Sequence, residues 1–148
     1  MRLGYKVNLN MKHEVILRFC FWDFEDILPD EITQIIGIEP VKVYRKGEKK
    51  NPKFPALTKQ NGWLMESPLD KFSPFEDQIE SILNLIESKI EIFKPLCEKY
   101  FCEFSCAIFL RGDGEESTPS VHLNERYNQI NTIIKAEFDL DLYLSTGN

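Results

Sequence analysis

Residues 27–46 read ILPDEITQIIGIEPVKVYRK and contain the clearest local signals of structure in the chain. Pro29 has the fixed φ angle that suits the first turn of a helix. Gly37 can adopt the left-handed conformation that ends a helix, and Pro40 prevents the helix from continuing. Residues 41–45 then alternate in the way expected of a strand. The stretch therefore predicts a short helix that leads into a β-strand.

Two kinds of periodicity predict the other elements. Apolar residues recur every three or four positions over 75–93, which predicts one long helix, and Asn124 can cap a second short helix. Alternation predicts four further strands, at 15–22, 62–66, 102–110 and 137–144. The first has two apolar faces and is expected at the centre of a sheet, 62–66 is short enough to be an edge strand, and 137–144 alternates as a strand with one buried and one solvated face.

These elements predict one α+β domain, with a mainly antiparallel sheet of about five strands packed against one long and two short helices. We expect residues 13–144 to form the domain, residues 1–12 to be a poorly ordered leader and residues 145–148 to be a tail. The order strand, helix, strand occurs in 15–45 and again in 102–144. An internal β-α-β duplication is therefore an alternative, although residue identity between the halves does not establish it.

The amino-acid composition argues against several classes of protein. A chain of 148 residues that is 43% hydrophobic can bury a sizeable core without a disulfide framework. No apolar run approaches the roughly 20 residues of a membrane span, and no export signal precedes the first strand. We therefore expect a cytoplasmic protein whose four cysteines are reduced thiols. The net charge of -6 argues against general affinity for nucleic acid.

Basic residues gather in one segment, residues 45–59, which holds six basic side chains and one acidic one. Cations beside aromatic side chains are typical of RNA and single-stranded DNA recognition. The candidate residues for binding a polyanion are Lys46, Lys49, Lys50 and Lys53. Because the rest of the chain is strongly acidic, it repels phosphate beyond a Debye length of about 8 to 10 Å. We therefore expect a solvated lysine loop in preference to a nucleic-acid interface.

Acidic residues provide a second candidate surface. Glu137, Asp139 and Asp141 share one face of the last predicted strand, where they could hold a divalent cation or contact a basic partner. The plainer interpretation is that the solvated face of a sheet has to be polar. Asp139 and Asp141, together with Glu80 and Glu87 on the long helix, are the residues that we expect to contact a partner protein.

Aromatic residues could line a pocket between the sheet and a helix, and the candidates for this role are Trp22, Tyr44 and Trp63. The sequence has no phosphate-binding glycine loop, nucleophile elbow or HExxH motif. We therefore assign no catalytic residues, expect no cofactor and lean against an enzyme, without excluding one.

Zinc binding is the remaining alternative for the cysteines. Thiolate and imidazole are zinc ligands, so Cys97, Cys102 and Cys106 with His122 form the candidate set. Their spacing does not fit, because Cys102 and Cys106 alternate with hydrophobic residues along a predicted strand. We expect core thiols and assign no metal site.

The residues that carry a family resemblance are Glu31-Ile32-Thr33, Gly37-Ile38-Glu39-Pro40, Gly47, Trp63, Asp139, Asp141 and Tyr143. On these residues the chain, over about 15–144, resembles the bacterial family called domain of unknown function 4279. The resemblance implies a small, stand-alone α+β domain without an assigned activity, and it brings no catalytic signature. Leu28 stands where a capping serine or aspartate is usual, which affects only the exact start of the helix.

The function that we expect is a non-enzymatic protein-binding module of the bacterial cytoplasm, acting through an acidic surface that complements a basic partner. An immunity protein that neutralises a toxin is one concrete form of this expectation. The first alternative is a small-molecule-binding domain or small enzyme with a pocket between sheet and helix. The second is nucleic-acid binding through residues 45–59. The sequence does not fix the oligomeric state.

Overall fold

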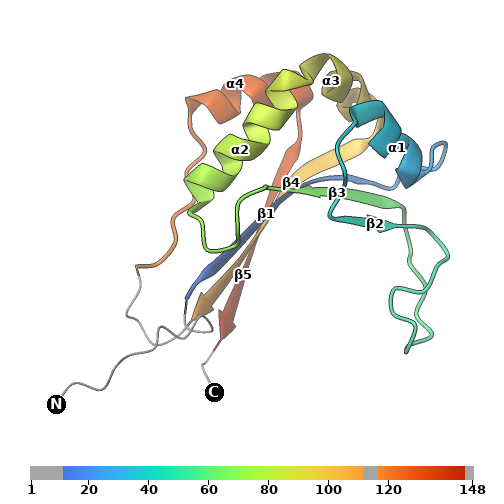
Figure 1. The fold of residues 1–148 in the computed structure, drawn as a ribbon, viewed down its shortest axis with the longest axis horizontal. Coiled ribbons are helices and arrows are strands. Elements are labelled where there is room, and N and C mark those ends of the chain that lie inside the picture. The colour runs from blue at the N-terminus through green and yellow to red at the C-terminus, as the bar shows by residue number, and fades with distance from the viewer. Residues whose placement is uncertain (1–11, 112–116, 146–148) are drawn as a thin grey trace.

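A single sheet runs through the protein and sets the positions of its helices (Figure 1). The computed structural model describes residues 12–111 and 117–145. Along these residues the order is β1 (Glu14–Trp22), α1 (Pro29–Ile36), β2 (Lys42–Tyr44), β3 (Gly62–Glu66), α2 (Phe75–Ser88), α3 (Ile90–Lys99), β4 (Phe101–Arg111), α4 (Glu125–Ile134) and β5 (Glu137–Ser145). The predicted α+β class is confirmed. The leader predicted for residues 1–12 and the tail predicted for residues 145–148 lie outside the described residues, apart from Lys12 and Ser145.

The five strands lie in the order β2-β3-β1-β4-β5. Three pairs are antiparallel, and only β4 and β5 run parallel to each other. β1 is the central strand, as its two apolar faces predict. The prediction that residues 62–66 form an edge strand is wrong, because β3 lies between β2 and β1. Gly62, Trp63, Leu64 and Met65 are all buried, which agrees with a strand that has a neighbour on each side.

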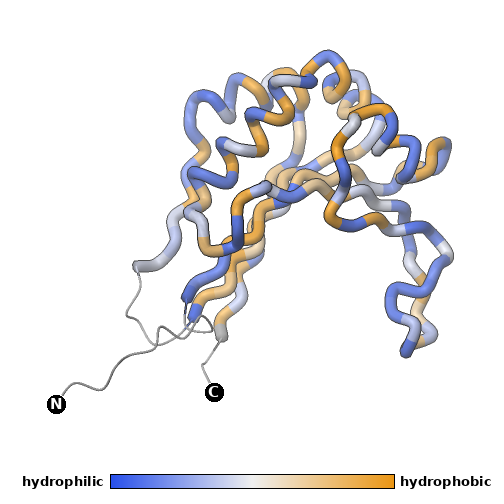
Figure 2. The backbone as a smooth tube through the Cα atoms, in the orientation of Figure 1, coloured by the Kyte–Doolittle hydropathy of each residue, from blue (hydrophilic) through white to orange (hydrophobic). Residues whose placement is uncertain are grey.

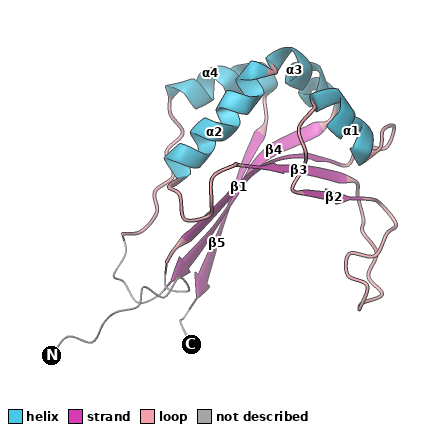
Figure 3. Ribbon diagram, in the orientation of Figure 1, coloured by secondary structure: helices cyan, strands magenta, loops and turns pink. Residues whose placement is uncertain are grey.

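All four described helices cover one face of the sheet (Figures 1 and 3). Hydrophobic residues are concentrated along the central strands beneath them (Figure 2). The core is rich in aromatic side chains that meet edge to face, for example Phe19 and Phe104, whose ring centroids are 5.0 Å apart. Phe93 of α3 packs against Phe19 at 5.7 Å. Burial of these aromatic side chains fixes the helical layer on this side and leaves the opposite face of the sheet uncovered.

The long helix predicted over 75–93 is wrong. α2 ends at Ser88 and α3 begins at Ile90, because Lys89 leaves the helical conformation with φ -129°. Pro95 lies inside α3 and does not end it. The apolar spacing cannot reveal this break, since both helices present their apolar sides to the same core. The described residues therefore form four helices in place of one long and two short ones.

The helix that we predicted within residues 27–46 agrees with its sequence signals. α1 starts at Pro29, and Gly37 has φ +76° and donates its backbone N–H to the Thr33 carbonyl at 2.7 Å. Leu28 supplies no side-chain cap. Instead its backbone N–H donates to Glu31 Oε2 at 2.7 Å, so the glutamate compensates in part for the missing cap.

The two strand-helix-strand units differ in their pairing. β4 and β5 are adjacent and parallel, with α4 between them in sequence. β1 and β2 also run in the same direction, but β3 lies between them and is antiparallel to both. None of the described helices is long and apolar enough to span a membrane.

Candidate functional site

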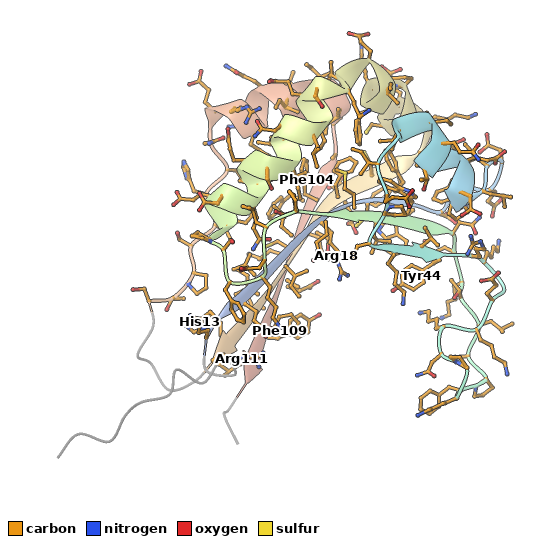
Figure 4. The ribbon with its side chains drawn as sticks, viewed as in Figure 1. His13, Arg18, Tyr44, Phe104, Phe109 and Arg111 are labelled. Carbon is orange, nitrogen blue, oxygen red and sulfur yellow. The ribbon has the colours of Figure 1, made fainter. Side chains whose placement is uncertain are left out.

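The face of the sheet that points away from the helices carries the candidate site, and we call it the open face. Figure 4 shows Arg18 and Tyr44 on this side. The strand registers place these side chains on it: Arg18, Cys20 and Trp22 of β1, Tyr44 of β2, Leu64 and Glu66 of β3, Glu103, Ser105, Ala107 and Phe109 of β4, and Glu137, Asp139, Asp141 and Tyr143 of β5. The open face is therefore partly aromatic and partly charged.

Two of the three predicted pocket residues meet on the open face. Trp22 and Tyr44 stack with ring centroids 5.7 Å apart. They do so over Gly62, where an added Cβ atom would lie 2.5 Å from Trp22 Cζ3, so the stack requires glycine at this position. Trp63 is on the other side of the sheet, fully buried, where it donates to Thr33 Oγ1 at 2.9 Å. The three aromatic residues therefore do not form one pocket.

Four carboxylates gather at one end of the open face, and we call them the acidic strip: Glu103, Glu137, Asp139 and Asp141. Glu137 is the direct neighbour of Glu103 across the parallel β4–β5 pair, and the two aspartates follow along β5. Among the described residues, no lysine, arginine or histidine forms an ion pair with any of the four. The acidic strip is thus a local excess of negative charge.

The pKa values within the acidic strip show the effect of this crowding. The pKa of Glu103 is raised, first by burial and then by the charges of Asp139, Asp141 and Glu137. Trp22 opposes the shift, because its Nε1–H donates to Glu103 Oε1 at 3.0 Å. The pKa of Asp141 is raised chiefly by the charge of Asp139. In both cases the ionised form is disfavoured, which is the environment that a bound cation would relieve.

A divalent cation was one interpretation of these carboxylates. Among the described residues, no group of three or more histidine, cysteine, aspartate or glutamate side chains is arranged to hold a metal ion. Glu137, Asp139 and Asp141 follow one another in a row along one face of β5. The geometry instead suits a row of separate cationic groups, such as lysine and arginine side chains.

The apolar side of β5 is more exposed to solvent than its sequence pattern predicts. Leu140, Leu142 and Leu144 lie on the helix side of the sheet, yet their exposed fractions rise along the strand from 43% to 62% and 73%. The expectation of one buried face is therefore wrong over the C-terminal half of β5. The reason is that this half of the strand extends beyond the helical layer (Figure 1).

Glu80 and Glu87 lie elsewhere on the molecule and already have partners. Both belong to α2, and Arg126 of α4 bonds to Glu80 and, at 3.3 Å, to Glu87. The same guanidinium donates to Asn84 Oδ1 at 2.8 Å. These contacts join α2 to α4 on the helix side of the sheet. The four acidic residues proposed from sequence as one partner-binding set therefore lie on two different surfaces.

The basic segment projects from the sheet on the side away from the helices (Figure 1). It has more structure than its composition predicts, since Lys49 and Leu57 form an isolated antiparallel bridge. Lys46 pairs with Glu25 at 3.0 Å. Within the described residues, Lys49, Lys50 and Lys53 form no ion pair. The structure thus separates one structural lysine from three solvated ones.

A surface groove of about 610 Å³ lies between α3 and α4. Its lining includes Lys94, Cys97 and Lys135, and none of the three aromatic candidates. The other three cysteines, Cys20, Cys102 and Cys106, are buried. Burial raises the pKa of Cys20 and of Cys106 to about 12, so both are unreactive core thiols.

Sequence reasoning missed two sets of charged residues. The sequence prediction does not include Glu103, although its place on the more polar side of the alternation over 102–110 is a usable signal. Glu14 is only 8% exposed and bonds to both Lys71 and Arg111, which lower its pKa. No local pattern could have found this cluster, because its members are distant in sequence.

Comparison with known proteins and protein families gives one match, to a family model. A family model with the description Domain of unknown function (DUF4279) matches residues 12–145. Neither the search of curated proteins nor the search of solved structures gave a significant match.

Proposed function

The chain belongs to the family described as Domain of unknown function (DUF4279), and from that starting point we propose that it is a protein-binding module. The acidic strip on the open face would hold a basic segment of a partner protein. The proposal includes a bacterial, cytoplasmic setting, and an immunity protein that captures a basic toxin surface is its most concrete form.

The observation that supports this proposal most strongly is the lack of ion pairs in the acidic strip. Like charges directly opposite each other on neighbouring strands destabilise a sheet. Glu103 and Glu137 are such a pair, and Asp139 and Asp141 continue the row. Polar residues without charge would keep this face soluble at a lower cost in stability. A cationic partner would remove this repulsion. Binding such a partner would therefore explain why the four carboxylates lie together on this face.

The other candidate functions have weaker support. The groove between α3 and α4 is lined mainly by exposed and half-buried residues, and Ile134 is its one buried lining residue. The three solvated lysines at 49, 50 and 53 favour an anionic ligand, and Phe54 beside them is 60% exposed. Nucleic-acid binding through this loop would fall steeply with salt and would not depend on the acidic strip.

The proposal is tested by capture of proteins from a bacterial lysate with three forms of the full chain. The first is the wild type, the second carries Asp139→Lys and Asp141→Lys, and the third carries Glu76→Lys and Glu91→Lys as a control with the same change in charge. Glu76 and Glu91 are exposed residues of α2 and α3.

We expect a basic protein that the wild type and the control retain and that the variant of the acidic strip loses by about tenfold or more, as for removal of well-placed charges. Equal capture by all three folded forms, or retention of nucleic acid in place of protein, would show that the acidic strip is not the binding surface. Circular dichroism confirms that each variant is folded.

A further inference from the structure

The outer edge of β5 lies beside both the acidic strip and the exposed leucines. β5 is the last strand in the sheet order, and β4 pairs with it along its whole length from Glu137 to Ser145. No other described strand pairs with β5, so a row of backbone N–H and C=O groups faces outward. An edge of this kind is a template for an added strand.

The two sides of β5 present opposite chemistry at this edge. On the open face the strand carries Asp139 and Asp141, whose charges repel each other. On the helix side it carries Leu142 and Leu144, which are 62% and 73% exposed. Because side chains alternate with a period of two, one extended segment can meet both sides at the same time.

We propose that the partner binds as an extended segment with alternating cationic and apolar residues, which adds to the free edge of β5 as a sixth strand. This inference deepens the proposed function, on which it rests for the basic character of the partner. The cationic side chains lie beside the acidic strip, and the apolar ones cover the exposed leucines. Main-chain hydrogen bonds to β5 supply affinity, and the two sets of side chains supply specificity.

Full antiparallel pairing of β5 with a second copy of the chain is disfavoured at its centre. Full antiparallel overlap of β5 with its copy would place the two Asp141 side chains opposite each other, since residue 141 is the midpoint of Glu137–Ser145. Like charges in that position are destabilising. A helix does not fit either, because its period of 3.6 residues cannot place cations and apolar groups on opposite sides of a strand edge. The charges and exposed leucines of β5 therefore best match an extended segment of another protein in which basic and apolar residues alternate.

The probes that test this inference are ten-residue peptides that alternate five lysines with five valines, with both termini blocked. A block peptide of the same composition carries all its lysines at one end. Two further peptides are N-methylated on alternate backbone amides, one at the lysines and the other at the valines. Each N-methylated peptide loses the donors along one edge only, so the pair has the same charge and the same density of N-methyl groups.

Binding to the full chain is measured by fluorescence anisotropy at low salt. We expect the alternating peptide to bind more tightly than the block peptide, and one of the two N-methylated peptides to lose at least about tenfold in affinity while the other stays close to the parent. That asymmetry identifies pairing through a single edge of the peptide.

The other outcomes separate the two proposals. If both N-methylated peptides bind as the parent does, and Asp139→Lys with Asp141→Lys weakens all of them, the acidic strip binds cations without strand addition and this inference is wrong. If no cationic peptide binds, the proposed function is contradicted together with it.

A pair of variants tests the apolar side of the edge. Leu142→Asp with Leu144→Asp should weaken the alternating peptide by about tenfold, because a charge replaces each apolar contact. Ile133→Asp is the control, since Ile133 is 42% exposed and belongs to α4, outside β5. Equal affinity for the Leu142/Leu144 variant and the wild type would overturn the proposed contact with the leucines.

Discussion

The pKa of a single residue, Asp141, shows that the acidic strip lowers the stability of the folded protein at neutral pH. Its pKa is raised by the charge of Asp139, so the folded state binds the Asp141 proton more tightly than the unfolded state does. Stability linked to this group is present below the unfolded pKa of about 3.9 and is lost as the pH rises through the folded pKa. At neutral pH the ionised side chain therefore destabilises the protein.

We predict that Asp141→Asn raises stability at pH 7, and that the gain shrinks as the pH falls below the carboxylate pKa values and both forms become uncharged. Urea unfolding at a series of pH values measures the difference. Glu76→Gln is the control, because Glu76 is an exposed glutamate outside the acidic strip. A lower midpoint for Asp141→Asn than for the wild type at pH 7 would contradict mutual repulsion in the acidic strip.

Single residues also show what a sequence can and cannot reveal about a site. The spacing of Asp139 and Asp141 placed them correctly on one strand face, because alternation is a local property. Glu103 joins them only through the pairing of β4 with β5, which no local pattern specifies. Trp63 is grouped with Trp22 and Tyr44 in the sequence prediction because all three are aromatic, but the strand registers place it on the opposite face of the sheet.

At the scale of secondary structure, local signals located the elements with distinct ends. α1 ends at Gly37 as its sequence predicts, and Asn124 caps α4 by accepting the Tyr127 backbone N–H at 2.9 Å. The break at Lys89 escaped prediction because no glycine, proline or capping side chain marks it. Where an end depends on packing against the core, periodicity alone is insufficient.

The start of α1 leads to a prediction about stability. Leu28 is 59% exposed at the N-cap position and has extended backbone angles, with φ -90° and ψ 153°. Serine is compatible with these angles and can accept a backbone hydrogen bond there. We expect Leu28→Ser to stabilise the protein by about 1 kcal/mol, which would raise the thermal midpoint by about 2 to 4 °C.

Leu28→Ala is the matched control, since it removes the same exposed side chain without adding a cap. Differential scanning calorimetry of the two variants gives the comparison. A serine variant no more stable than the alanine variant would mean that Glu31 already satisfies the helix start.

At the scale of the whole molecule, the sequence identified the fold class and the strand count but not the order of strands across the sheet. The strand order decides which faces meet, and it is set by contacts between residues far apart in the chain. It places β3 inside the sheet and β5 at its edge. The edge position leaves β5 with backbone groups that no other described strand pairs with on its outer side.

The helices on one side and the uncovered face on the other give the protein two distinct surfaces (Figure 3). The helix side holds ion pairs that join elements to each other, such as the contacts of Arg126. The open face ends in carboxylates that no described cation neutralises. Arg18 and Glu66 form an ion pair on the same face, so the excess of negative charge is confined to the acidic strip. This local excess is the main structural reason to place binding on the open face and not on the helices.

The measurement that tests this claim most directly is a map of backbone amide chemical shifts during titration of the full chain with the alternating lysine-valine peptide. We predict that the largest changes fall on β5 and on residues 103–107 of β4, with small changes in α2 and α4. Changes centred on Glu80, Glu87 and the neighbouring helix residues, with β5 unaffected, would contradict the claim that the open face and its edge strand are the binding surface.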